Sequence, residues 1–156
     1  MNKMTLDLLN IFTRYDDGTY LGQPWNHKGK TYATDKAILI ITPKHSEVDI
    51  KNKYATYICK AIAKYPRATE FGPLPSLPVP DYFCEECEEW HYSYRPVQIG
   101  KAHINAIYLF KLHLLPNCKI SQPEEPEAPI HFIFDGGEGW LMPLLLDKEE
   151  VKPDAK

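Results

Sequence analysis

The high proline content limits where this chain can form regular secondary structure. The 156-residue sequence contains 14 prolines, about twice the usual share of ~5%. Seven of them fall in two short segments, 71–80 and 123–129. Because proline has a fixed φ and no amide N–H, neither segment can form a regular helix or a central strand. Both are predicted to be extended connectors. For 71–80 the alternative is a polyproline ligand for an aromatic-lined groove.

Helical patterns occur in three other segments. Apolar residues recur at helical spacing over Leu6–Tyr15, Lys51–Lys64 and Ile104–Leu115, which predicts three amphipathic helices. Pro66 and Pro116 follow the second and third segments and are predicted to end them.

Strand patterns surround these helices. Ala37–Thr42 is short, apolar and rich in β-branched residues, which predicts a buried strand. Ile130–Phe134 and Trp140–Met142 flank the glycine-rich segment Asp135–Gly139, which is predicted to be the turn of a hairpin. The fold class predicted is therefore α+β, an antiparallel sheet with two or three helices on one face. The predicted core residues are Leu9, Phe12, Ile38, Ile40, Phe132, Phe134 and Trp140.

The length favours one domain, because 156 residues can bury a single good core. We expect this domain to span 1–146, followed by a charged flexible tail over 147–156. No run of about 18 apolar residues exists, so no membrane contact is expected. Met1–Asn10 lacks the apolar region of a signal peptide, and a cytoplasmic location is expected.

The charge is unevenly distributed. Residues 1–70 carry 11 basic and 7 acidic side chains, whereas residues 71–156 carry 7 and 14. This excludes a uniformly basic nucleic-acid binder but allows one basic face. The densest basic group lies in and just after the second predicted helix, and we predict that it contacts nucleic acid. Its members are Lys51, Lys53, Lys60, Lys64 and Arg67. The alternative is that these side chains only solvate an amphipathic helix.

Cys84-Glu-Glu-Cys87 is the sharpest local motif. Two thiolates at this spacing can bind one zinc ion, but a tetrahedral site needs further ligands. The residues that would have to converge on it are Cys59, Cys118, His91 and His103. The neighbouring glutamates are predicted to raise the thiol pKa, which disfavours a redox dithiol. We expect two free cysteines in an acidic loop and no cofactor, with zinc at Cys84 and Cys87 as the alternative.

No catalytic pattern is present in the sequence. There is no His-Glu-x-x-His, no Gly-x-Ser-x-Gly and no phosphate-binding glycine loop. Asp135 and Glu138 are a candidate acid–base pair, although two carboxylates in a turn are usually solvated. The chain is therefore expected not to be an enzyme.

Two groups of segments resemble the bacterial sliding clamps, the β subunits of the replicative DNA polymerase. Lys30–Ile40, with its Ala33-Thr34-Asp35 triplet, resembles a strand–turn–strand unit of that family. His103–Leu115, Ile130–Phe134 and Trp140–Leu144, with Met142-Pro143, resemble in order the end of a clamp subunit.

The resemblance implies a clamp-like topology, in which residues 44–102 form an insertion without a counterpart. Clamp helices carry basic side chains toward DNA phosphates, and Lys101 and Lys111 lie at or next to the matched helix here. The function implied is a non-enzymatic DNA-associated accessory protein of phage or mobile-element type. Its expected partners are duplex DNA, contacted through the backbone, other proteins, and further copies of the chain. The alternative is a small protein-interaction or regulatory module that keeps the fold without binding DNA, and docks through 81–89 and the proline connector.

Overall fold

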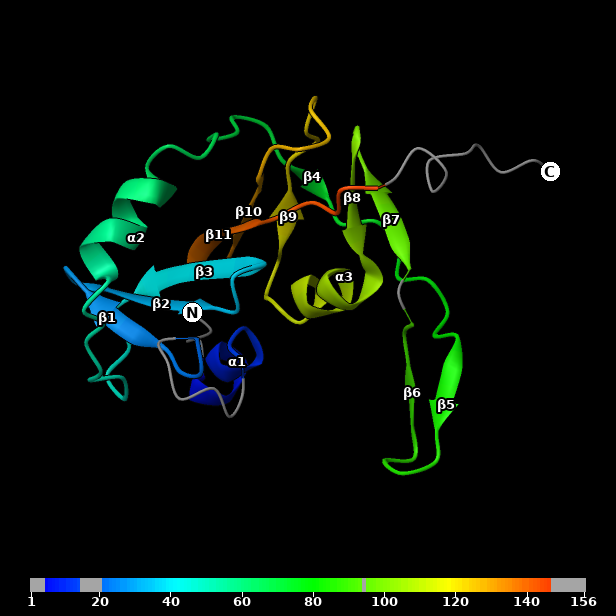
Figure 1. Ribbon diagram of the computed structural model, residues 1–156, viewed down its shortest axis with the longest axis horizontal. Helices are drawn as coiled ribbons and strands as arrows, with labels where there is room; N and C mark the ends of the chain where they lie inside the picture. The colour runs from blue at the N-terminus through cyan, green and yellow to red at the C-terminus, as the bar shows by residue number, and fades with distance from the viewer. Residues whose placement is uncertain (1–4, 15–20, 94, 147–156) are drawn as a thin grey trace.

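The structure, a computed structural model, describes residues 5–14, 21–93 and 95–146. Its centre is a seven-stranded antiparallel sheet (Figure 1). In spatial order the strands are β1 (Trp25–His27), β2 (Lys30–Thr34), β3 (Ile38–Pro43), β11 (Gly137–Leu141), β10 (Ile130–Phe134), β9 (Lys119–Ile120) and β4 (Gly72–Pro73). Three helices, α1 (Leu6–Ile11), α2 (Ala55–Ile62) and α3 (Ala106–His113), complete the α+β class that the sequence predicts.

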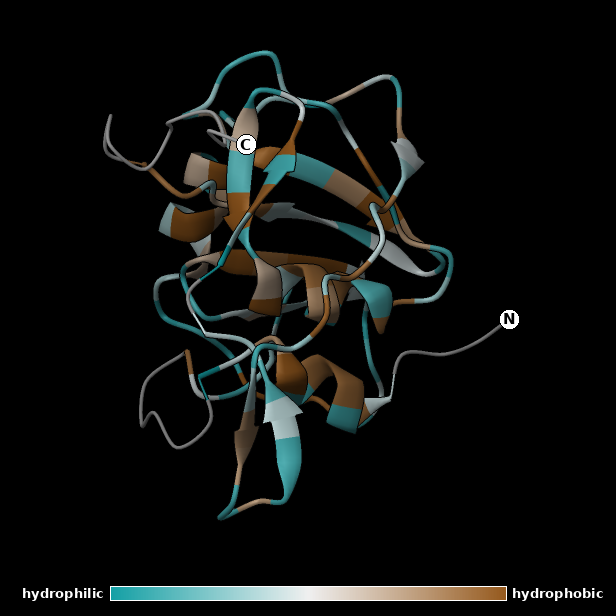
Figure 2. Ribbon diagram, turned by 90° about the vertical axis from the view of Figure 1, so that its right-hand side faces the viewer, coloured by the Kyte–Doolittle hydropathy of each residue, from teal (hydrophilic) through white to brown (hydrophobic). Residues whose placement is uncertain are grey.

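Two hairpins lie outside the main sheet. The strands β7 (Pro96–Ile99) and β8 (Ala102–Asn105) pair with each other and pack into the core through Ile99 and Ile104. The strands β5 (Tyr82–Cys84) and β6 (Glu89–His91) form a hairpin that projects away from the sheet in Figures 1 and 2. The predicted insertion over 44–102 thus supplies α2, β4, this projecting hairpin and β7.

Each face of the sheet carries its own apolar cluster. Ile38 and Ile40 of β3 point toward α1, α3 and the β7–β8 hairpin, where Leu9 and Leu109 are fully buried. Leu39 and Ile41 point to the opposite face and pack with Trp140 beneath α2. In Figure 2, brown hydrophobic stretches occur on both the strands and the helices. The helices therefore occupy both faces, two on one and α2 on the other, whereas the sequence analysis expects them on one.

All seven predicted core residues are buried. The helix limits are narrower than predicted. Thr5 caps α1 by accepting a hydrogen bond from the Leu8 amide at 3.1 Å. Ile104, predicted to be helical, lies in β8, because the side chain of Asn105 caps α3 one residue later. The predicted helical residue Tyr15 and the tail 147–156 lie outside the described residues.

The glycine-rich segment departs from its prediction. Only Asp135 and Gly136 turn, and Gly137–Leu141 forms β11 in the middle of the sheet. A Cβ on Gly139 would lie 2.2 Å from the Leu39 carbonyl oxygen and 2.5 Å from the Phe132 ring. Glycine is therefore required inside this strand for close packing.

The proline segments behave as predicted. Pro73 lies in β4 at the edge of the sheet, where its missing amide interrupts no central ladder. Segment 123–129 connects β9 to β10 without regular structure. None of the helices in the described ranges has the length and apolar character that crossing a membrane requires.

Candidate functional site

Lysines gather at the end of the sheet that carries the β1–β2 turn. The Lys44 amide donates to the Gly29 carbonyl at 3.1 Å, and Lys51 forms a bridge with Asn26 of β1. These contacts bring three separate segments of the chain together. We call the resulting group the basic end, and it comprises the exposed residues Lys28, Lys30, Lys44, Lys51 and Lys53.

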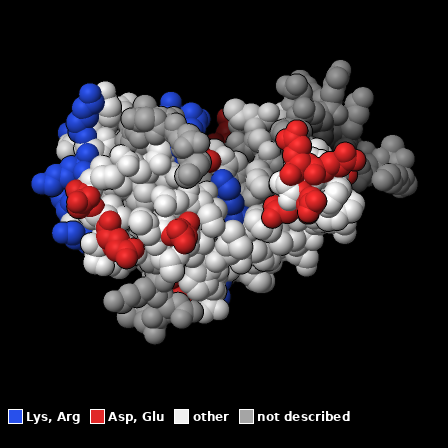
Figure 3. Space-filling view, turned by 90° about the horizontal axis from the view of Figure 1, so that it is seen from below, with Lys and Arg blue, Asp and Glu red and all other residues white. Residues whose placement is uncertain are grey.

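Only Lys51 and Lys53 of this group belong to the predicted nucleic-acid residues. Lys28, Lys30 and Lys44 join it through strand pairing. Glu47 and Asp49 lie between β3 and α2, in the segment that also carries Lys44, Lys51 and Lys53, and they reduce the net positive charge of the basic end. Figure 3 shows blue side chains at this end and the acidic residues of the β5–β6 hairpin at the other.

Two further lysines of the predicted basic group lie on or just after α2. Lys60 lies on α2 and Lys64 just after it, and both are exposed. Ile58 and Ile62 pack against the apolar cluster that contains Trp140, so α2 is anchored through the side that faces the sheet. Tyr57, an aromatic residue within the predicted amphipathic helix Lys51–Lys64, is 77% exposed, because the short helix buries only the row that contains Ile58 and Ile62.

Lys101 and Lys111 lie elsewhere. Lys101 is in the β7–β8 turn, and Lys111 is on α3 with its ammonium 5.2 Å from the Tyr108 ring. Because α3 and α2 cover opposite faces, the sheet separates Lys111 from Lys60. The structure thus brings together the segments that carry the lysines of the basic end, and the sheet separates the α2 lysines from Lys111.

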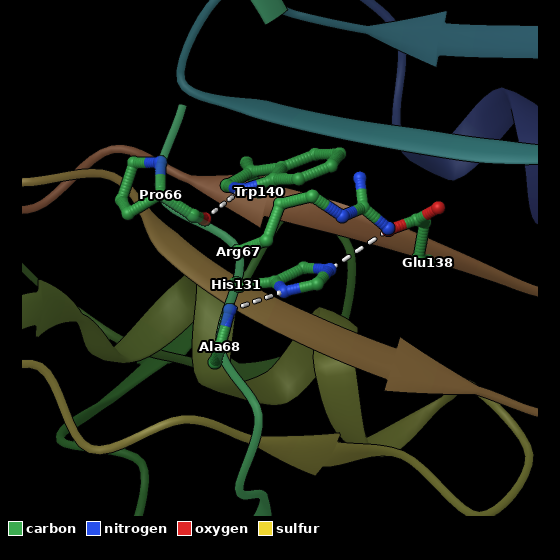
Figure 4. Close-up of polar contacts among 6 residues, drawn as sticks. All are labelled: Pro66, Arg67, Ala68, His131, Glu138 and Trp140. Carbon is green, nitrogen blue, oxygen red and sulfur yellow. Dashed lines mark hydrogen bonds and ion pairs between the residues drawn. The ribbon is translucent and has the colours of Figure 1, made fainter. Parts of the chain in front are cut away.

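Arg67 belongs to a polar cluster in the middle of the sheet (Figure 4). Its guanidinium lies 2.9 Å from the Glu138 carboxylate and 5.4 Å from the centre of the Trp140 ring. The same carboxylate oxygen accepts from Nε2 of His131 at 2.8 Å. Arg67 is exposed, as predicted, but its charge is already partly compensated by Glu138.

His131 connects the cluster to the chain that leaves α2. Its ring stacks on Trp140, and its Nδ1 accepts from the Ala68 amide at 3.1 Å. Trp140 donates to the Pro66 carbonyl at 2.9 Å. Glu138 is therefore a strand residue in an ion-pair network, and the structure does not bring it to Asp135 as an acid–base pair. The network fixes segment 66–68 on the sheet.

The projecting hairpin carries a second cluster. The Cys84 and Cys87 sulfurs and a His91 ring nitrogen lie within 4.8 Å of one another. The Cys87 Sγ is 2.8 Å from His91 Nε2. The turn between β5 and β6 and their pairing explain the convergence, because His91 pairs with Tyr82 two residues before Cys84.

The pKa values of the two thiols of this cluster shift in opposite directions. Hydrogen bonds from the amides of Cys87 and Glu86 lower the pKa of Cys84. Its neighbouring glutamate raises that pKa only weakly, so the predicted increase is wrong for Cys84. The pKa of Cys87 is raised, chiefly by its contact with the Cys84 side chain.

The other residues considered for zinc lie away from the hairpin. Cys59 on α2 contacts the Tyr32 hydroxyl at 3.4 Å. Cys118 packs against the core, and burial raises its pKa to about 12. His103 lies on β8. Of the four residues that the sequence offers, the structure brings only His91 to Cys84 and Cys87.

The geometry defines an α+β protein with a basic surface around α2 and a Cys–Cys–His cluster on a separate hairpin. Comparison of the chain with protein-family models, with curated proteins and with solved structures gives no match.

Proposed function

We propose that this protein is a non-enzymatic DNA-associated accessory protein that contacts the duplex backbone through the basic end and the α2 lysines. The observation that carries the proposal is the convergence of three chain segments on one group of exposed lysines, with Lys60 and Lys64 exposed on or just after α2. Charge of this kind meets phosphates without reading sequence.

The clamp resemblance supports the same proposal. The resembling segments fall on β2–β3, α3 and β10–β11, and β3 pairs directly with β11. They therefore form one contiguous part of the structure. A clamp-like topology is the finer description that we propose for it. DNA contact in this protein would use α2 in place of the helix matched to clamps, because α3 carries only Lys111 and His113 as basic residues.

The distribution of charge indicates which side of the protein would face DNA. The β5–β6 hairpin carries Glu85, Glu86, Glu88 and Glu89. Figure 3 shows a red group on the other side of this view from most of the blue side chains, and further red side chains among the blue ones. Repulsion from phosphates turns this hairpin away from DNA while the basic end approaches.

The test is a comparison of two charge reversals with the same net charge. Lys60→Glu/Lys64→Glu changes the α2 surface, and Lys101→Glu/Lys119→Glu changes exposed lysines outside it. Duplex binding is measured by fluorescence anisotropy over a range of low salt concentrations. The first variant should lose about 1.8 from the magnitude of the log–log salt slope, about 0.9 for each phosphate contact. The second should keep the wild-type slope.

Two results would contradict the proposal. One is the absence of wild-type DNA binding at low salt. The other is an equal loss of slope in both variants, which would assign the effect to net charge or to the α3 side of the molecule.

A second function is favoured by one observation on the hairpin. Phe83 and Trp90 pair across β5 and β6 with ring centres 5.6 Å apart, yet they are 47% and 62% exposed. Exposed aromatic residues beside glutamates suit a protein partner that presents basic and apolar side chains.

This alternative makes the protein an interaction module. A photo-crosslinking residue at Trp90 should then give a specific product in cells that Phe83→Ala abolishes. The same residue at Lys119 serves as the matched control. If wild type fails to bind DNA and this product forms, the interaction module is the better description.

A further inference from the structure

We infer that Cys84, Cys87 and His91 form a zinc site that holds the β5–β6 hairpin in shape. The three ligand atoms lie within 4.8 Å of one another. They come from one turn and one strand pair, so the hairpin positions all three by itself.

The distances fit one zinc ion. With Zn–S near 2.3 Å and Zn–N near 2.0–2.1 Å, tetrahedral geometry separates two sulfurs by about 3.8 Å and a sulfur and a nitrogen by about 3.6 Å. The Cys87 Sγ and His91 Nε2 are 2.8 Å apart, and all three atoms lie within 4.8 Å. Changes below about 1 Å in these partly exposed side chains bring them to the required spacing.

Backbone amides donate hydrogen bonds to both sulfurs. Amides of Glu86 and Cys87 donate to the Cys84 sulfur, and the amide of Glu89 donates to the Cys87 sulfur. Such hydrogen bonds stabilise negative charge on sulfur, which is the form that binds zinc. Two thiolates and one imidazole form a donor set that selects zinc over magnesium or calcium.

The hairpin also needs a stabilising element. The strands β5 and β6 have three residues each and pair only with each other among the described strands. A lone two-stranded hairpin is marginally stable in water. Its base is tied by Ser93 to Asp81 and by Tyr92 to the Pro78 carbonyl, but Cys84–Glu89 lies beyond these contacts. A bound metal would replace the core that this part of the chain lacks.

Three protein ligands leave the fourth zinc position to solvent or to an incoming group. Each thiol releases one proton when it binds the ion, and no electrons are transferred. The site is independent of the proposed DNA contact, since the hairpin and the basic end lie at different ends of the molecule in Figure 3.

The test is metal stoichiometry on the full-length protein, stripped with chelator and then reconstituted with Zn²⁺. Wild type should bind one zinc ion per chain. Cys84→Ser/Cys87→Ser should lose it, while Cys59→Ser/Cys118→Ser, which also removes two thiols, should keep it. Likewise His91→Gln should weaken binding about 10-fold or more, and His113→Gln should leave it unchanged.

Two spectroscopic readouts follow the ligands directly. Co²⁺ in place of Zn²⁺ should give sulfur-to-metal charge-transfer bands and the visible bands of four-coordinate cobalt in wild type. ¹⁵N NMR of the histidines should place the metal on Nε2 of His91. Absence of bound metal in reconstituted wild type, or equal stoichiometry in the two double-serine variants, would overturn the inference.

Discussion

At the scale of single residues, His131 shows how a buried polar side chain fixes a connecting segment. It is 4% exposed, and both ring nitrogens have partners, the Ala68 amide and the Glu138 carboxylate. Since Nδ1 accepts a hydrogen bond, Nε2 carries the proton and the ring is neutral. Protonation of Nδ1 would remove the acceptor for Ala68.

This arrangement gives a pH dependence with a defined sign. Burial lowers the pKa of His131 below its usual value of about 6.5. The unfolded chain therefore takes up this proton first as the pH falls. The stabilising contribution is fully present above about pH 6.5 and is lost as the pH falls through the lower folded-state pKa.

We predict that this pH-dependent part of the free energy of unfolding disappears in His131→Asn and persists in His113→Asn. Urea unfolding between pH 8 and pH 5 measures it, because the contributions of carboxylates other than Glu138, the partner of His131, are common to both variants and cancel in the comparison. NMR titration of His131 in wild type should give a pKa below 6.5. An identical pH dependence in wild type and His131→Asn would contradict the prediction.

Contacts between residues that are distant in the chain could not be predicted from the sequence. Among the predicted nucleic-acid residues, Lys111 is half-buried and the others are exposed, namely Lys51, Lys53, Lys60, Lys64, Arg67 and Lys101. The ion pair of Arg67 with Glu138 spans 71 positions of the chain, so no local pattern reveals it. Likewise, only backbone pairing between distant segments brings Lys44 to Gly29 and Lys51 to Asn26.

At the scale of elements, the β2–β3 turn is connected to α3 by one carboxylate. Asp35 accepts from the amides of Ala37 and Ile38 at 2.8 and 2.9 Å, and from the Tyr108 hydroxyl at 2.7 Å. The triplet Ala33-Thr34-Asp35 predicts the turn. It does not predict Tyr108, which lies 73 positions away.

We predict that Asp35→Ala lowers the free energy of unfolding by about 2–4 kcal/mol, because several hydrogen bonds to a buried carboxylate are lost. Tyr108→Phe removes one of them and should have a smaller effect, about 1–3 kcal/mol. Chemical denaturation of the single and double variants measures the coupling between them. Strictly additive effects would show that the Asp35–Tyr108 contact contributes nothing.

The strand β11 depends on a glycine that faces an aromatic ring. Gly139 pairs with Phe132, and a Cβ there would collide with the Leu39 carbonyl and the Phe132 ring. We predict that Gly139→Ala lowers the free energy of unfolding by about 1–3 kcal/mol or more. Gly72→Ala is the matched control, since a Cβ at Gly72 meets nothing within 4 Å. Thermal unfolding compares them, and equal melting temperatures would refute the packing argument.

Element positions were more predictable than element ends. Apolar spacing locates α1, α2, α3 and β3, and the two apolar runs locate β10 and β11. The limits fail where a tertiary contact decides them. Ile104 fits a helical stripe, yet pairing with Val97 places it in a strand. Gly137 and Gly139 are predicted to lie in a turn but belong to β11. They are needed there because neighbouring strands approach too closely for a Cβ, which is visible only once the sheet is packed.

At the scale of the whole molecule, both edges of the main sheet are closed to further strands. At one edge, residues 50–51 lie against β1, and the Asn26 amide donates to the Ile50 carbonyl at 2.8 Å. At the other edge, β4 has two residues, and Pro73 has no amide to donate. Short, blocked edges of this kind prevent strand pairing between copies.

We therefore predict a monomer of 18.0 kDa in solution, which contacts DNA from one side instead of encircling it. One such domain would need about six copies to close a ring, and each copy would have to offer two complementary edges. Light scattering after size-exclusion chromatography, repeated over a wide range of protein concentrations, measures the mass. An assembly of several copies that persists on dilution would show that an interface other than the sheet edges joins them. Salt dependence would then distinguish the two modes of binding, because a closed ring stays on circular DNA at salt concentrations that release a one-sided electrostatic contact.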